Sequence, residues 1–389
     1  MSTANDGDAE APDKGTQRHL RVMMVQTQAE NAGAQEISRL VGAGLEARGH
    51  RVDHLFFYSR TGGASDLGNV DVCVEGRPRD PIALARFVLA ARAKIAAAKP
   101  DVVLTFQHYG NVLGAPIAHL AGVHRVIANQ VSASDVVAPA LRLADRLFGQ
   151  AGLYDRITVN SDDTRRLYEN HPASYRDRIV SIPHGFEVKR GGISKTQART
   201  RFGLPEGVDL LGCAARLHPT KRLDLAIRLL PLMPTRHLAL AGQGPDRERL
   251  EALAAELGVT SRVHFVGELQ PMAIGEFLAA LDVFVFPTVA ETFGLAAVEA
   301  ASAGLPVVAT DLPVLREVLE VDGRPAAILV DTADVAAFAA AVDGVFADAE
   351  LAANLRAAGA GLTRRFSLDA MVEAYARLID EVTERRRAA

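Results

Sequence analysis

The sequence has no tryptophan, few other aromatic residues and only two cysteines. Cys73 and Cys213 each lie in a short apolar run and are far apart in the chain, so we expect two small core residues rather than a disulfide or a nucleophile. This cysteine usage is typical of a reducing compartment, and we expect a cytoplasmic protein. Residues 1–18 are polar and contain no apolar core segment, so we expect a disordered tail and not a signal peptide.

An excess of positive charge is also absent. The chain has 43 Lys and Arg against 47 Asp and Glu, a formal net charge of −4, which does not favour nucleic acid as a partner. No apolar run approaches the roughly 20 residues that a membrane-spanning helix needs. The apolar helix pattern at 81–99 carries Arg86, Arg92, Lys94 and Lys99. These cations are typical of a solvated helix face, which we favour, or of a weak peripheral contact with anionic lipid.

The alternation of strand and helix patterns predicts an α/β fold. At 389 residues the chain is too long for one ordinary core, so we expect two domains. Short β-branched runs alternate with helical patterns, and apolar strands of this kind are typical of parallel sheets covered on both faces. The expected strands are 20–26, 50–57, 101–106, 125–130, 156–161 and 178–183, then 209–216, 237–242, 262–267, 282–287, 306–310 and 326–330. This series predicts two doubly wound parallel sheets.

The domain boundaries follow from the break in this series. Pro, Gly, Lys and Arg interrupt the periodicity after residue 182, so we expect an N-terminal domain at 19–183, a hinge at 184–195 and a C-terminal domain at 196–365. Residues 366–389 form a helix pattern with no strand after it, and we expect this helix to pack back on the N-terminal domain. Doubly wound sheets bind ligands beyond the carboxyl ends of their strands, so the cleft between the two domains is the expected site.

Three cations follow the first strand of the second half. Arg216 ends that strand, and Lys221 and Arg222 lie at the start of the next helix pattern. Cations beside a helix N-terminus are unfavourable, because that end already carries a partial positive charge, unless an anion binds there. The alternative is a solvated surface pair, but the position at a strand end favours an anion site.

Two glutamates stand eight positions apart in the nearly uncharged stretch 287–310. Glu291 falls in a loop after a strand, and Glu299 falls in the helix that this loop begins. Between them, Phe293, Gly294 and Leu295 supply backbone N–H groups that suit a phosphate. Carboxylates bind vicinal sugar hydroxyls because each one accepts several hydrogen bonds. One acid near each end of a phosphate-binding helix start matches the shape of a sugar nucleotide.

These motifs carry a resemblance to a known family. The stretch 287–310 resembles the E-x7-E signature of the retaining GT-B glycosyltransferases of family 4, and the resemblance extends from residue 20 to about 385. The segment 215–227 resembles the family's Arg…Lys diphosphate motif. Residues 240–269 are similar to its nucleotide-binding region, and residues 33–52, which begin at Gly33, to its glycine loop and first helix.

The resemblance implies a role for each motif. Arg216 and Lys221 would neutralise the donor diphosphate without a metal or other cofactor. Glu291 would contact the donor sugar and Glu299 the ribose, and Val263 and Phe265 would flank the base. The implied reaction moves a hexosyl-type sugar from a nucleoside diphosphate sugar, with UDP favoured, to a hydroxyl of a saccharide, lipid-linked or small-molecule acceptor on the N-terminal domain.

The chain departs from the family pattern in its first half. Many members have a histidine after the strand at 125–130, where Gln130 is expected here, and His108 at another strand end is a candidate substitute beside the donor sugar or acceptor. His184 replaces the usual asparagine of the hinge. Two alternatives use the same fold: a sugar-nucleotide epimerase or hydrolase, and a non-catalytic sugar-nucleotide-binding protein.

Overall fold

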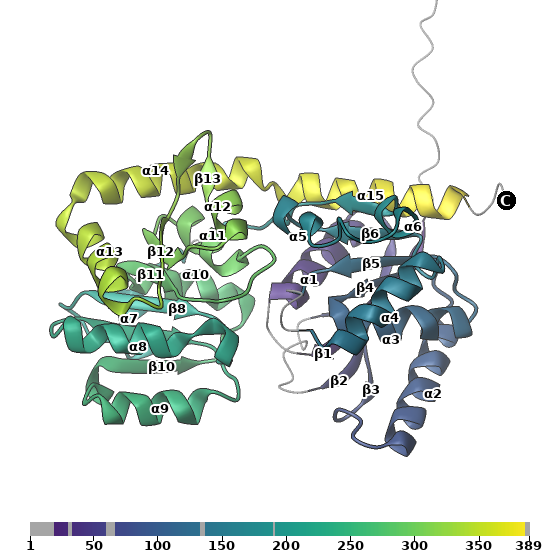
Figure 1. The fold of residues 1–389 in the computed structure, drawn as a ribbon, viewed down its shortest axis with the longest axis horizontal. Coiled ribbons are helices and arrows are strands. Elements are labelled where there is room, and N and C mark those ends of the chain that lie inside the picture. The colour runs from purple at the N-terminus through teal and green to yellow at the C-terminus, as the bar shows by residue number, and fades with distance from the viewer. Residues whose placement is uncertain (1–18, 30–32, 60–66, 133–136, 190, 386–389) are drawn as a thin grey trace, which may run out of the picture.

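The computed structural model describes residues 19–29, 33–59, 67–132, 137–189 and 191–385. The predicted tail at 1–18 lies outside these residues. Figure 1 shows two α/β domains side by side, with the yellow C-terminal helices running along one edge of both. Each domain has a parallel sheet with helices on both faces, so the predicted fold class is confirmed. No helix in the described ranges is long and apolar enough to cross a lipid bilayer.

The N-terminal domain is built on a sheet with the strand order β3-β2-β1-β4-β5-β6-β7 among the described residues. Its strands are β1 Arg21–Ala29, β2 Arg51–Ser59, β3 Val70–Val74, β4 Val102–Phe106, β5 Val126–Gln130, β6 Arg156–Val159 and β7 Ile179–Ser181. Its helices are α1 Gly33–Glu46, α2 Pro81–Ala98, α3 Gln107–Leu120, α4 Pro139–Gln150, α5 Asp162–Arg166 and α6 Ala173–Arg176. The strand β3 is the apolar run around Cys73, which the expected series of strands omits.

The C-terminal domain has a second parallel sheet, with the order β10-β9-β8-β11-β12-β15. Its strands are β8 Leu210–Ala214, β9 His237–Ala241, β10 Val263–Gly267, β11 Val283–Phe286, β12 Val307–Thr310 and β15 Ile328–Val330. The short strands β13 Glu320–Val321 and β14 Arg324–Pro325 form a separate antiparallel pair. The helices are α7 Lys195–Phe202, α8 Leu223–Leu229, α9 Arg247–Glu256, α10 Pro271–Ala280, α11 Leu295–Ser302, α12 Pro313–Val318, α13 Val335–Ala347, α14 Ala349–Arg365 and α15 Leu368–Arg385.

The two faces of the N-terminal sheet are covered from different parts of the chain. The connections β1–β2 and β3–β4 run in opposite directions along the sheet, and right-handed crossovers therefore put α1 and α2 on opposite faces. The helices α2 and α3 share one apolar cluster, whereas α1 shares another with α15. Within that second cluster Tyr375 is fully enclosed and its hydroxyl donates to Asn129 Oδ1 at 2.8 Å. The C-terminal helix α15 is thus part of the N-terminal core.

The chain passes between the domains twice, and the two passages touch. Phe186 pairs with Ser367 in an isolated parallel bridge. Gly185 is required for this approach, because a Cβ atom there would lie 2.5 Å from the carbonyl oxygen of Ser367. The strand β7 and the helix α7 lie on either side of the segment predicted as the hinge, which stays a prediction.

Candidate functional site

A cavity of about 700 Å³ lies between the carboxyl ends of the two sheets. The first two turns of α1 and the residues after β4 and β5 line one side, and loops after β8, β9 and β11 line the other. Most residues predicted for the site line this cavity: Gly33, Arg216, Lys221, Glu291, Phe293, Gly294, Leu295 and Glu299. His108, Gln130, Val263 and Phe265 do not. The described residues contain no group of three or more His, Cys, Asp or Glu side chains that could hold a metal ion.

The start of α11 forms one wall of the cavity. Gly294 precedes the helix with φ at +78°, a left-handed conformation that favours glycine. A Cβ atom at this position would also lie 2.4 Å from Leu315 Cδ2, so a larger residue would have to displace the buried Leu315 side chain. The first turn of a helix leaves N–H groups without partners inside the helix, and such a turn binds anions.

Lys221 and Glu291 both line the cavity and form an ion pair with each other. Lys221 Nζ donates to Glu291 Oε1, and Thr288 Oγ1 donates to the same oxygen at 3.0 Å. The two charged side chains are 23% and 12% exposed, respectively, so water screens the pair only partly. Lys221 Nζ also lies 5.5 Å from the centre of the Phe286 ring. A half-buried cation and a half-buried acceptor of hydrogen bonds therefore lie side by side.

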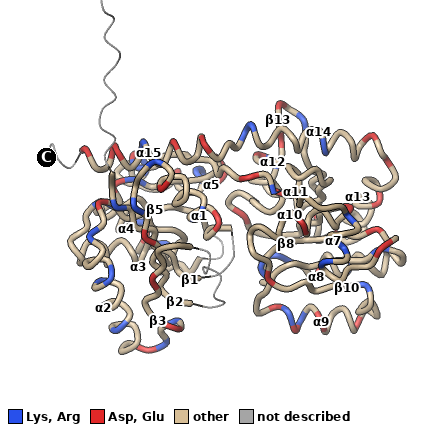
Figure 2. The backbone as a smooth tube through the Cα atoms, turned by 180° about the vertical axis from the view of Figure 1, so that it is seen from behind, with Lys and Arg blue, Asp and Glu red and all other residues tan. Residues whose placement is uncertain are grey.

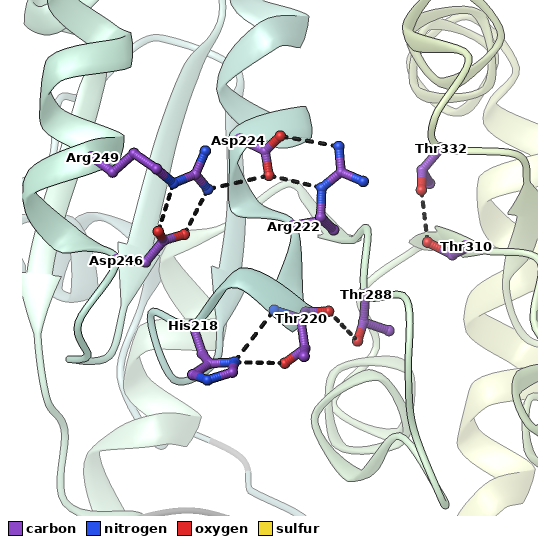
Figure 3. A network of polar contacts seen from close by, with 9 residues as sticks. All are labelled: His218, Thr220, Arg222, Asp224, Asp246, Arg249, Thr288, Thr310 and Thr332. Carbon is purple, nitrogen blue, oxygen red and sulfur yellow. Dashed lines mark hydrogen bonds and ion pairs between the residues drawn. The ribbon is translucent and has the colours of Figure 1, made fainter. Parts of the chain in front are cut away.

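Hydrogen bonds join the loop after β8 to the loop after β11 (Figure 3). The carbonyl oxygen of Thr220 accepts from Thr288 Oγ1 at 3.3 Å, and His218 Nδ1 lies 2.9 Å from Thr220 Oγ1. Arg222, directly after Lys221, turns elsewhere and donates two bonds of 3.1 Å to Asp224. Of these two adjacent cations, only Lys221 lines the cavity.

Lys189 joins both domains through buried charges. Its ammonium lies 2.9 Å from Glu36 Oε1 in α1 and 2.9 Å from Glu299 Oε1 in α11, and the three side chains are 11%, 9% and 8% exposed. Arg39 adds two bonds of 2.9 Å to Glu36. Burial lowers the pKa of Lys189, but the two carboxylates outweigh it and the net pKa is raised. Lys189 is therefore a cation that holds Glu299 in place.

The two acids of this cluster respond differently to burial. Burial raises the pKa of Glu299, and Lys189 offsets that rise only in part. Burial would also raise the pKa of Glu36, yet the bonds from Arg39 and the charge of Lys189 lower it below the usual value for glutamate. Glu36 thus stays ionised, whereas Glu299 depends on Lys189 for its charge.

The loop that carries Glu291 is fastened to the N-terminal domain. Ser161 Oγ and Thr164 Oγ1 donate to the carbonyl oxygen of Thr292 at 2.9 and 3.2 Å. Asn160 Nδ2 lies 3.1 Å from Thr292 Oγ1 and 2.8 Å from His184 Nε2. Burial lowers the pKa of His184 to about 3, so this histidine is neutral and its Nε2 accepts the bond. These contacts fix the position of Glu291 relative to the N-terminal half of the cavity.

Gln130 and His108 are not at the cavity, which corrects the prediction for both. Gln130 is fully buried, and its Nε2 donates to Asp145 Oδ1 at 2.9 Å and to Tyr175 Oη at 3.1 Å. His108 is buried beside the strand end, and its backbone N–H donates to Ser132 Oγ at 3.4 Å. The lining residues after β5 are instead Val131 and Ser132.

The position predicted for the base is also corrected. Val263 belongs to the apolar core, and the Phe265 ring stacks under Arg247 with 5.1 Å between the guanidinium carbon and the ring centre. Both lie within β10 and not beyond its end. The residues of this segment that line the cavity are Glu268 and Leu269, which follow directly after the end of β10.

Several lining residues were missed from the sequence, and three of them are notable: Gln107, Lys189 and Glu36. Gln107 follows β4 with φ at +65°, an unusual conformation for this residue type, and its Oε1 is buried without a hydrogen-bond partner among the described residues. Its position at a strand end is a signal that sequence reasoning could have used. Lys189 and Glu36 gave no such signal, because the ion pairs of Lys189 with Glu36 and Glu299 join residues that are far apart in the sequence.

Comparisons with known proteins place the chain in a family. Residues 194–361 match "Glycosyl transferases group 1", and residues 33–190 match "Glycosyltransferase Family 4". The D-inositol 3-phosphate glycosyltransferase of Acidothermus cellulolyticus is 32% identical over 353 residues, which cover 81% of this chain and 76% of that protein.

Two solved structures share the fold. Sucrose-phosphate synthase from Thermosynechococcus elongatus has a TM-score of 0.78 at 21% identity, covering 94% of this chain and 99% of its own. HepE from Anabaena, solved in complex with UDP-glucose, has a TM-score of 0.80 at 19% identity, covering 93% of this chain and 100% of its own. With both halves matched and the two-sheet architecture shared, the chain belongs to the family 4 glycosyltransferases and has the GT-B fold.

Proposed function

We propose that the protein transfers a hexosyl-type sugar from a nucleoside diphosphate sugar, with UDP favoured, to a hydroxyl acceptor, and that the anomeric configuration is retained. The observation that carries this proposal is the arrangement of Lys221 and Glu291 beside the start of α11. A cation, an acid and a helix N-terminus there suit the diphosphate and sugar of one ligand. The UDP-glucose bound by HepE supports this class of donor.

The donor lies across the start of α11 in this proposal. Arg216 and Lys221 contact the diphosphate, and Glu291 accepts hydrogen bonds from the sugar. Glu299 accepts from the ribose, while Glu268 and Leu269 lie beside the base in place of Val263 and Phe265. The acceptor binds on the opposite wall, where Gln107 and Ser132 offer polar groups. The relative's name, which includes inositol 3-phosphate, supports a small polyol acceptor.

The chemistry then needs no metal or other cofactor. The bond between the anomeric carbon and the diphosphate oxygen breaks, the acceptor oxygen bonds to that carbon, and the acceptor proton leaves with the nucleoside diphosphate. Negative charge grows on the leaving diphosphate, where Arg216, Lys221 and the start of α11 stabilise it. Such preorganised groups act strongly because a partly dry cavity screens them little.

Product analysis tests this function. The protein is incubated with UDP-glucose and inositol phosphate in excess EDTA, and NMR follows both the released UDP and the new glycosidic bond. We expect UDP release to match glycoside formation, with an α-linked product from the α-linked donor. A β-linked product would remove retention from the proposal, and activity that returns only with Mg²⁺ would remove the roles of Arg216 and Lys221. Release of UDP with no glycoside from any acceptor would indicate a hydrolase.

Calorimetric titration separates the two acids. Glu291→Gln keeps the size of the side chain but loses charge-assisted hydrogen bonds, each worth about 1.5–3 kcal/mol, so we expect transfer to fall about tenfold to a hundredfold. Free UDP has no sugar and should bind this variant almost as it binds the wild type. Glu299→Gln should weaken the binding of UDP and the binding of UDP-sugar equally. The proposed position of the donor across the start of α11 is wrong if Glu291→Gln weakens the binding of UDP as much as that of UDP-sugar. It is also wrong if Glu299→Gln leaves the binding of UDP unchanged.

A further inference from the structure

The outer surface of α2, α3 and α4 is unusually apolar. Among the described residues, twelve large hydrophobic side chains are exposed, and seven of them lie on these three helices: Ile82, Leu84, Leu89, Tyr109, Leu120, Leu143 and Leu147. The three helices are neighbours that cover one face of the N-terminal sheet. Exposed apolar residues that gather in this way mark an interaction surface. We call it the α2–α4 surface.

The helix α2 is apolar on both of its sides. Its inner side buries Phe87, Ala91 and Ile95 against the sheet. Its outer side exposes Ile82 at 68% and Leu89 at 64%. A surface helix normally turns a polar face to water, and a helix that is hydrophobic all round is normally covered all round. No element in the described part of the chain covers the outer side of α2.

The charges on this surface have one sign. The helix α2 carries Arg86, Arg92 and Lys94 and no acid, and α3 carries no charged residue of either sign. The helix α4 carries Arg142 and Arg146, both exposed. Figure 2 shows blue segments along α2, although the whole chain has a formal net charge of −4.

The acids near the surface neutralise only part of its positive charge. The single acid of α4, Asp145, points inward and is buried, where it accepts hydrogen bonds from Gln130, Tyr154 and Tyr175. Asp80 caps the first turn of α2 by accepting from Ala83 N at 2.8 Å, and Asp71 in β3 pairs with Lys94. The arginines of α2 and α4 therefore face solvent beside exposed leucines.

We propose that the α2–α4 surface binds the surface of an anionic lipid bilayer. Leu89 and Leu147 enter the boundary between headgroups and acyl chains, and the neighbouring arginines donate to lipid phosphates. A bilayer offers an anionic layer directly above an apolar layer at every lateral position. The exposed leucines of this surface can therefore contact acyl chains while its arginines contact phosphates. A protein partner would instead need a pocket matched to each of these side chains. This proposal is independent of the sugar-transfer function.

Vesicle co-sedimentation of the full chain tests the proposal. We expect binding to vesicles of phosphatidylcholine mixed with phosphatidylglycerol, weaker binding at higher salt, and no binding to phosphatidylcholine alone. Removing one cation near an anionic membrane costs about fivefold in binding, so Arg86→Gln with Arg142→Gln should cost about twenty-fivefold. Leu89→Ser with Leu147→Ser should cost about tenfold, because two side chains lose their contact with the acyl boundary.

The matched control changes one exposed apolar residue and one exposed arginine on the other domain. Met272, 86% exposed on α10, and Arg356, exposed on α14, are replaced by serine and glutamine, and this variant should bind vesicles like the wild type. Melting curves check that every variant is folded, and release of UDP from UDP-glucose provides a separate activity readout. Equal binding to both kinds of vesicle, no binding to either, or loss in the control variant would overturn the proposal. So would a dimer in the absence of lipid that the α2–α4 variants abolish, because a second copy would then cover this surface.

Discussion

Replacing Lys221 with methionine is expected to lower the rate of sugar transfer about a hundredfold to a thousandfold, the usual loss when one preorganised donor is removed from a developing negative charge. Methionine has a similar length but no charge, so the cavity keeps its shape. The leaving diphosphate then loses the cation that lies closest to Glu291 in the structure. Steady-state rates with saturating donor and acceptor measure this loss directly.

Arg222 provides the control, because it is the adjacent cation and is bound to Asp224 away from the cavity. Arg222→Met should change the transfer rate less than about threefold, as surface substitutions away from special features have small effects. Since Lys221 and Glu291 are in contact, combining Lys221→Met with Glu291→Gln should cost less than the product of the two single losses. Equal losses for Lys221→Met and Arg222→Met would contradict the assignment of Lys221 to the diphosphate.

Replacing Lys189 with methionine is expected to destabilise the fold by about 3–5 kcal/mol at pH 7, because buried carboxylates lose the cation that compensates them. Glu36 keeps its bonds from Arg39, so Glu299 accounts for most of the cost. Urea denaturation of the wild type and the variant, both at pH 7, gives the difference in the free energy of unfolding.

The dependence of this loss on pH has a definite sign. Burial already raises the pKa of Glu299, and without Lys189 its folded-state pKa rises further above the unfolded value. The folded state then binds a proton more tightly than the unfolded state, so the variant gains stability as the pH falls. We therefore expect the deficit of Lys189→Met to shrink between pH 7 and pH 5.

Lys195 is the matched control in the same connection between the domains. Its ammonium lies 2.5 Å from Asp282 Oδ1, but its side chain is 49% exposed. An exposed pair of this kind contributes at most about 1 kcal/mol, so Lys195→Met should destabilise the fold only slightly and with no marked change between the two pH values. A loss for Lys189→Met no larger than that for Lys195→Met would show that the buried cluster does not stabilise the folded state.

The fold could be predicted from the sequence because its signals are local. Strands such as β4 and β8 are buried on both faces and therefore appear as continuous apolar runs between helical patterns. Glycines at strand and helix ends, such as Gly294, mark turns that no other residue fits easily. The loops that build the cavity follow from the rule that parallel strands present their carboxyl ends at one edge.

The missed parts of the site depend on information that is not local. Every residue of β5 is buried, so its pattern does not show which way Gln130 points, and only the fold reveals that Asp145 and Tyr175 bind it. Lys189 looks like one of several cations in a polar connection. Its two acidic partners come from α1 and α11, and only the folded chain brings them together.

The position of α15 has a consequence for how the protein is made. This helix covers one face of the N-terminal sheet, yet it follows the entire C-terminal domain in the sequence. During synthesis at roughly 5–20 residues per second, the interval between completing β7 and reaching α15 is on the order of ten to forty seconds. Throughout that time the apolar cluster that α1 shares with α15 lacks its outer layer. The nascent N-terminal half therefore exposes an apolar surface while it is still attached to the ribosome. A chaperone can bind this surface until the final helix emerges.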